Sequence, residues 1–343
     1  MKHYRITSFV VLCLIFVFLS CKDQGILSPP KPVEMRPLTA AELKLVQANG
    51  DFWLDMLKSI EEVDQKKNVF ISPLSISMAL GMTLNGAQGP TLDSMKNVLK
   101  FNAMSTEEMN ESYKSLVALL VNVDPNVQFN IANSIWYRND FKVEQDFIDV
   151  NKVFFDAMVS PLNFADPAAK DVINGWVNQK TNGKIPTILD EPIPSAMVMY
   201  LINALYFKGA WTSKFEKDLT RDDLFTLRDS SKVACTMMIQ KGTFRYIVGN
   251  DYQAIELPYG GQVFSMVVIL PASATEIHSF IESFSIQRWT ALIGGFESNE
   301  LTLMFPKFKL EYSVSLREPL VALGMEIAFN PGCADFTRIN KAG

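Results

Sequence analysis

The sequence predicts a mixed α+β domain, and three observations lead to that fold class. Helical spacing of apolar residues dominates the first half of the chain, and strand-like runs dominate the second half. Segregated helices and strands favour α+β over alternating βαβ units. Apolar residues make up 48% of the 343 residues, which is enough for a large core in one or two domains. We see no internal repeat.

The continuous apolar run at 198–211 is the element around which we expect the other elements to pack. Tyr200 and Ile202 would point to one face and Leu201 and Leu205 to the other, with Asn203 among the latter. A strand buried on both faces, in the middle of a covered sheet, has this pattern. A helix is the alternative, but the aromatic residues and the closing Lys-Gly favour a strand. An unpaired buried amide costs about 1–3 kcal/mol, so Asn203 is expected to meet other polar groups.

The amino terminus has the features of a signal peptide over residues 1–20. Positive charge in the first five residues precedes an almost wholly apolar stretch, 6–20, which is shorter than the roughly 20 residues of a membrane span. Cys21 follows directly and, despite Phe18, resembles the lipid-bearing cysteine of a bacterial lipoprotein. The prediction is a lipid anchor at Cys21 and a location in the cell envelope, on the outer membrane or cell surface. Plain secretion is the alternative.

Residues 21–38 are predicted to be a tether between the lipidated cysteine and the domain. This stretch is polar and contains four prolines, and its apolar residues show no period. An extended proline-rich segment of this length spans at most about 50 Å. The folded domain is therefore expected over residues 39–343.

The first half of the domain is predicted to be mainly helical. Ser72 and Pro73 suit the N-cap and first position of a helix, and the helix that follows is apolar nearly all round, which is typical of a core helix. Ser75 is its polar exception. Helices are expected over 39–62, 73–84, 92–99, 106–121, 143–155 and 168–180, and strands over 68–71, 129–138 and 158–164.

The second half is predicted to contain most of the strands. Gly260-Gly261 separates two strand patterns and is a strong signal for a two-residue hairpin turn. Strands are expected over 244–248, 254–259, 262–270 and 301–311, and short helices over 276–283, 286–292 and 314–323.

Charge and motif content exclude several function classes. The formal net charge of −5 becomes −7 once Lys2 and Arg5 are removed with the leader. Because no basic cluster is present, a nucleic-acid partner is not expected. Cys235 and Cys333 are far apart in sequence and are expected to be small buried hydrophobes, so neither a disulfide framework nor a metal or cofactor site is predicted.

The sequence offers no enzyme chemistry either. Nucleophile-elbow, phosphate-loop and dinucleotide motifs are missing from the sequence. The only histidine after the leader, His278, is predicted to lie solvated on a surface helix. Adjacent carboxylates such as Glu61-Glu62 diverge on a helix, which indicates solvated faces rather than an acid–base pair. We therefore do not expect this protein to be an enzyme.

A series of short motifs, taken in order, covers most of the domain. They are NVFISPLSIS at 68–77, ANSIW at 132–136, INGWV at 173–177, TNGKI at 181–185, the run at 198–211 with Phe215 and Thr220, AIELPY at 254–259, FSMVVILP at 264–271, FPKF at 305–308 and ADF at 334–336. Together they resemble the serpin family. The resemblance implies a serpin fold, in which helices pack around a large central mixed β-sheet with further sheets.

The serpin resemblance also implies an activity and a partner. Serpins are suicide inhibitors, in which a protease cuts an exposed loop and the cut loop inserts as a new strand into the central sheet. The expected partner is therefore a serine endopeptidase, or alternatively a cysteine endopeptidase, and the expected state is a monomer.

The resemblance assigns roles to six residues around the place where the sheet opens. The shutter lies beneath the opening, and the breach lies at its top, where a tryptophan covers the gap and a lysine reaches an acidic partner. The matching residues are Ser72, Ser75 and Asn203 for the shutter, and Gly209, Trp211 and Lys307 for the breach.

Compared with the family pattern, the sequence is expected to be incomplete at its carboxyl end. After the ADF motif a serpin has a further central strand, the hinge, the reactive loop with the scissile bond and the closing strands. Three interpretations stay open: an incomplete copy of an inhibitor, a truncated gene product without inhibitory activity, or a non-inhibitory lipoprotein that uses the scaffold for binding. The resemblance does not identify the target protease.

Overall fold

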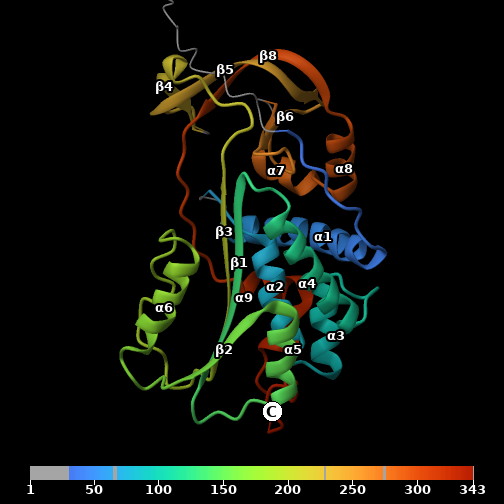
Figure 1. The fold of residues 1–343 in the computed structure, drawn as a ribbon, viewed down its shortest axis with the longest axis vertical. Helices are drawn as coiled ribbons and strands as arrows, with labels where there is room; N and C mark the ends of the chain where they lie inside the picture. The colour runs from blue at the N-terminus through green and yellow to red at the C-terminus, as the bar shows by residue number, and fades with distance from the viewer. Residues whose placement is uncertain (1–30, 65–67, 228, 273–275, 343) are drawn as a thin grey trace, which may run out of the picture.

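The computed structural model describes residues 31–64, 68–227, 229–272 and 276–342 (Figure 1). The predicted signal peptide, the lipidation site at Cys21 and the first part of the predicted tether lie outside these residues. Within them, none of the helices combines the length and the hydrophobicity that crossing a membrane requires.

Helices make up most of the first half of the described chain, as predicted. Thr39 and Ser105 are the N-cap residues of capping boxes at the starts of α1 and α4. Ser72 caps α2, which has Pro73 in its first turn. The helices are α1 Ala40–Val63, α2 Pro73–Leu84, α3 Gly89–Val98, α4 Thr106–Asn122, α5 Gln145–Phe155, α6 Ala169–Lys180, α7 Ile277–Ser283, α8 Ile286–Gly294 and α9 Arg317–Leu320.

The described residues form two sheets, and the first has three strands in the order β2-β1-β3. β1 (Val127–Arg138) pairs parallel with β2 (Ala157–Leu162) and antiparallel with β3 (Met199–Gly209). β3 is the predicted central run, but it lies at the edge of this sheet, and most of its residues are only half-buried. The predictions of a strand and of a sheet covered on both faces are confirmed, whereas the predicted place in the middle of the sheet is not observed within the described residues, where β3 has one strand partner.

The two faces of this sheet pack against different helices (Figure 1). Ile135 and Leu201 belong to the largest core cluster, which is formed with α1, α2, α4 and α5. Trp136 and Ala204 face the other way and pack against α6. The sheet therefore lies between α6 on one side and the main helical layer on the other.

The second sheet has five strands, in the order β4-β5-β6-β7 with β8 paired to the other edge of β5. It lies at the upper end of Figure 1, beyond the ends of β1 and β3. Its strands are β4 Arg221–Thr226, β5 Lys232–Val248, β6 Tyr252–Tyr259, β7 Phe264–Pro271 and β8 Glu297–Pro306. The β6–β7 hairpin predicted at Gly260-Gly261 is confirmed, but its loop has four residues, 260–263, rather than two.

Several sequence predictions differ from the structure. Residues 68–71 form no strand, and neither do residues 307–311, because no described segment pairs with either stretch. β4 and the first half of β5 were not predicted, since their mixed polar residues give no clear alternation. The expected helix at 314–323 is the short α9 followed by a π-helical turn, Val321–Met325, and Cys333 is exposed rather than buried.

Candidate functional site

Two asparagines from neighbouring strands form a partly buried polar pair on the face of the first sheet that packs against α2. Asn133 and Asn203 are direct register partners, and the Asn203 Nδ2 donates to the Asn133 Oδ1 at 2.7 Å. Asn133 Nδ2 donates in turn to the carbonyl of Phe155 at 2.6 Å. The buried Oδ1 of Asn203 accepts no hydrogen bond from any described residue. The expectation that Asn203 meets polar groups is thus confirmed for its Nδ2, whereas its Oδ1 has no donor among the described residues.

Ser72 and Ser75 lie at the start of the helix that packs against this asparagine. The Ser72 Oγ accepts from the backbone N–H of Ser75 at 3.3 Å, which starts α2. One turn further along, the Met78 sulfur lies 3.8 Å from the Asn203 Nδ2. Among the described residues, neither serine hydroxyl bonds to Asn203. The structure brings the helix and the amide together, but not the three side chains into one hydrogen-bond network.

At the upper end of β3, two aromatic side chains are stacked beside a glycine. Trp211 stacks on Tyr259 with ring centroids 4.4 Å apart and planes 14° apart, and the two residues form an isolated antiparallel bridge. A Cβ on Gly209 would come within 2.8 Å of the Tyr259 ring. Glycine is therefore required for this close approach. Burial raises the pKa of Tyr259, consistent with a ring enclosed between neighbours.

Lys307 is connected to this region only indirectly. Phe215 links Trp211 to Phe305, with ring centroids 6.1 Å from Trp211 and 6.4 Å from Phe305. The backbone N–H of Lys307 donates to Thr236, and its side chain is exposed. Within the described part of the chain no acidic residue pairs with Lys307, so the acidic partner implied by the resemblance is not observed.

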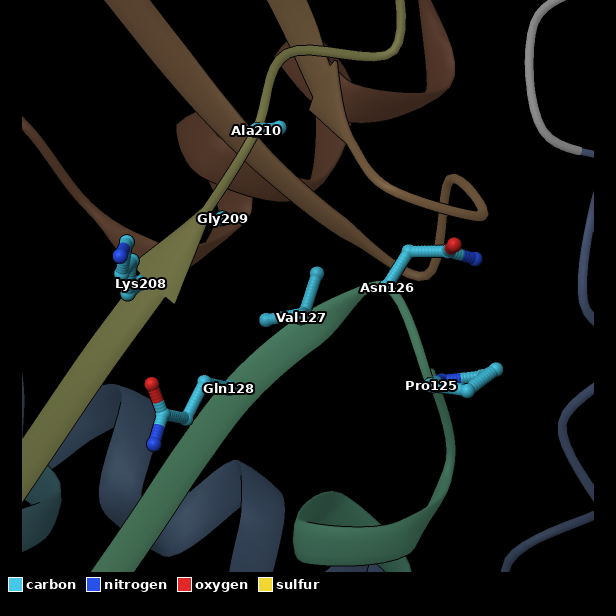
Figure 2. Close-up of a pocket in the computed structure, with 7 residues that line it drawn as sticks. All are labelled: Pro125, Asn126, Val127, Gln128, Lys208, Gly209 and Ala210. Atoms are coloured by element: carbon cyan, nitrogen blue, oxygen red, sulfur yellow. The ribbon is translucent and has the colours of Figure 1, made fainter.

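A hollow of about 650 Å³ opens between the ends of β1 and β3 (Figure 2). Gln128 and Lys208 are register partners on the facing strands and supply polar groups on one side, while Asn126 lies beyond the strand end. The lining of the hollow is formed by Pro125, Asn126, Val127, Gln128, Lys208, Gly209 and Ala210. It adjoins the Trp211–Tyr259 stack through Gly209.

His278 and Glu61 are paired, contrary to the expectation that both are solvated. The Nδ1 of His278 on α7 hydrogen-bonds to the Glu61 carboxylate on α1, and the Glu61 side chain is 9% exposed. This contact raises the pKa of His278. Within the described residues, no group of His, Cys, Asp or Glu has a metal-binding arrangement.

Asn133 and Tyr259 are the residues of this site that were not singled out from the sequence. Both lie inside motifs of the serpin resemblance, but their roles depend on partners about 50 to 70 positions away in sequence. An amide inside an otherwise apolar strand, directly opposite Asn203, is the signal that would have identified Asn133.

Comparison with known proteins agrees with this arrangement. The mixed α+β fold, with a helix-covered sheet and a second sheet across its end, is shared with solved serpin structures, and residues 47–343 match the family model "Serpin (serine protease inhibitor)". The chain therefore belongs to the serpin family.

Three similar proteins illustrate the relationship. Serpin B6 of Macaca fascicularis is 32% identical over 87% of this chain and 81% of its own length. The leukocyte elastase inhibitor of Equus caballus is also 32% identical, with the same two coverages. The crystal structure of tengpin, a thermophilic serpin, in the native state superimposes with a TM-score of 0.81 at 32% identity, covering 90% of this chain and 78% of tengpin.

Proposed function

We propose that this protein inhibits serine endopeptidases, or cysteine endopeptidases, by accepting a cleaved loop as a new strand beside β3. The protease remains covalently attached to the loop and is displaced as the loop inserts. The family membership supports inhibition, and the name of the equine relative states that it inhibits an elastase. The scissile bond is not assigned to any residue of this sequence.

The state of β3 is the observation that carries this proposal. Its inner edge is fully paired with β1, and in the described residues its outer edge has no strand partner. Directly beneath, the buried Oδ1 of Asn203 lacks a donor. Unpaired strand edges and orphaned buried acceptors cost free energy that an added strand recovers. The geometry therefore supports strand addition at this edge.

We assign the six residues named from the resemblance to roles in this opening. Asn203, Ser72 and Ser75 would form the shutter, where Asn203 changes partner as the new strand enters. Gly209 and Trp211 would form the breach, and the Trp211–Tyr259 stack would cover its entrance. Lys307 would contribute a positive charge there, with its acidic partner outside the described contacts.

We further propose that the protein is a monomeric lipoprotein of the cell envelope. The charged start, the apolar stretch 6–20 and Cys21 support this location. Incorporation of a radiolabelled fatty acid in the producing cell tests it, and the Cys21→Ser variant is the control. Loss of label in that variant supports the anchor, and label that persists contradicts it.

Inhibition is tested by incubating the protein, expressed from its complete reading frame, with trypsin-like, elastase-like and subtilisin-like enzymes. A band that survives SDS and corresponds to protein plus protease supports the proposal. Cleavage without an adduct by all three enzymes would favour a binding scaffold. Turnover of peptide or ester substrates would instead identify a hydrolase.

A further inference from the structure

The first described residues are docked on the domain rather than extended as a free tether. Both terminal nitrogens of the Arg36 guanidinium donate to the Glu42 carboxylate, at 2.9 and 2.5 Å, and one of them also donates to Ser115. Glu42 is only 1% exposed. The hydrogen bonds from Arg36 hold the pKa of Glu42 well below its usual value. This ion pair, in which Glu42 is buried and Arg36 is partly exposed, is one anchor of the segment.

A second anchor lies three residues earlier, on the turn between β6 and β7. The backbone N–H of Val33 donates to the carbonyl of Gly261 at 2.9 Å. A Cβ on Gly261 would lie 2.5 Å from the Val33 side chain, so the contact is close enough to require glycine. Figure 1 shows this segment, in dark blue, passing from the β6 region toward α1. We call residues 33–36 the strap.

The turn held by the strap is also held by a buried carboxylate. The buried carboxylate of Asp124, in the connection before β1, accepts from the backbone N–H of Gly261 at 2.7 Å. A Cβ on Gly260 would come within 2.7 Å of the same carboxylate. The two backbone polar groups of Gly261 are therefore bonded to Val33 and to Asp124, and both contacts hold the turn.

From this turn, hydrogen bonds lead directly to the residues on both sides of Trp211. Gly260 N–H donates to the carbonyl of Ala210 at 2.9 Å, and Thr212 Oγ1 donates to the carbonyl of Gly260 at 2.9 Å. Thr212 N–H donates to Pro258, also at 2.9 Å. Together with the Trp211–Tyr259 stack, these bonds fix the end of β3 to the turn.

We propose that the strap is a conformational clamp that couples the amino-terminal segment to the breach. Docking of Val33 and Arg36 holds the β6–β7 turn, and the turn holds Trp211 over the end of β3. Release of the strap, by a pull on the chain before residue 33 or by a ligand that binds the segment, loosens the end of β3. The effect on strand insertion rests on the proposed function, whereas the coupling itself does not.

Hydrogen exchange measured by mass spectrometry on the full chain tests this coupling. The variant pair Val33→Pro and Arg36→Gln removes the backbone donor and the ion pair. Met35→Gln changes an exposed residue of the same segment and is the matched control. In the released protein, exchange of the Gly260 and Thr212 amides is expected to rise roughly tenfold, as the loss of one or two hydrogen bonds permits. The control is expected to match the wild type.

Faster exchange confined to residues 31–39 would overturn the proposal, because the strap would then be a local attachment only. Unchanged exchange in α2 and β1 verifies that the variants remain folded. The variant Asp124→Asn weakens the other contact of the same turn, the hydrogen bond from the Gly261 N–H. It is expected to speed exchange at Gly260 and Thr212 while the Arg36–Glu42 ion pair stays in place. Since exchange does not depend on a protease, a missing adduct would count against the proposed function and not against the coupling.

Discussion

β1 and β3 are paired along their length, yet the more polar of the two strands is the better buried. β1 contains Gln128, Asn130, Asn133 and Ser134, and four consecutive residues from Asn133 are buried. β3 is almost entirely apolar up to Phe207, and only two of its residues are buried. Hydrophobicity of a strand therefore does not decide its burial here.

The difference follows from the position of each strand in the sheet. β1 has β2 on one side and β3 on the other, with helices over both faces. β3 has the same helices over its faces, but a strand on one side only within the described residues. Its apolar side chains thus match a central strand, although within the described residues β3 lies at an edge.

The largest expected effect compares two register partners in the main core, Ile135 and Leu201. Ile135→Ala removes a fully buried side chain from β1 and is expected to lower the free energy of unfolding by about 2–5 kcal/mol. Leu201→Ala, in half-buried surroundings on β3, is expected to cost about half as much. Urea unfolding of both variants measures the difference. A cost for Leu201→Ala equal to that of Ile135→Ala would contradict the interpretation of β3 as an edge strand.

The asparagine pair sharpens the same comparison with polar side chains. Asn133→Ala removes the Nδ2 bond to the Phe155 carbonyl and leaves the Asn203 Nδ2 with only the weak contact to the Met78 sulfur, and is expected to cost about 2–3 kcal/mol. Asn203→Ala leaves the buried Asn133 Oδ1 without its donor but also removes an orphaned acceptor, so its expected cost is lower, about 1 kcal/mol. The two single variants and the double variant, compared by chemical unfolding, measure the coupling. A larger cost for Asn203→Ala would show that its oxygen has a partner.

How much of this fold was predictable depends on how local the causes are. α2 was predicted with its observed ends because Ser72, Pro73 and the apolar run act within the helix itself. The edge position of β3 was not predicted, because the order of strands in a sheet depends on pairing between segments that are distant in sequence. Glu61 was expected to be solvated, but a partner 217 positions away covers it. The strand and the polar exceptions of the site were predictable, whereas the Asn133 and Tyr259 contacts required the tertiary structure.

A smaller effect is expected from the two serines at the start of α2, the helix that packs against β3. Ser72→Ala removes the N-cap and is expected to cost about 1 kcal/mol. Ser75→Ala removes a hydroxyl with no hydrogen bond among the described residues and is expected to stay within about 0.5 kcal/mol of the wild type. Thermal and urea unfolding measure both. A large cost for Ser75→Ala would mean that its hydroxyl bonds to a group under β3, and would strengthen its assignment to the shutter.

The smallest effect is a pH dependence of the free energy of unfolding, which is expected from the His278–Glu61 contact between α7 and α1 but not from the sheet. Neither β1 nor β3 contains Asp, Glu, His or Cys. The difference between the unfolding free-energy costs of Ile135→Ala and Leu201→Ala is therefore expected to be constant between pH 6 and 9. The pKa of His278 is raised by Glu61, so the stability that this pair contributes is fully present below the unfolded-state pKa, about 6.5. It is lost as the pH rises through the folded-state pKa. Urea unfolding at a series of pH values should show this decline in the wild type and in both core variants, but not in His278→Gln. If the decline in the free energy of unfolding persists in His278→Gln, the titrating group is another residue. If the decline differs between Ile135→Ala and Leu201→Ala, the His278–Glu61 pair is coupled to the sheet.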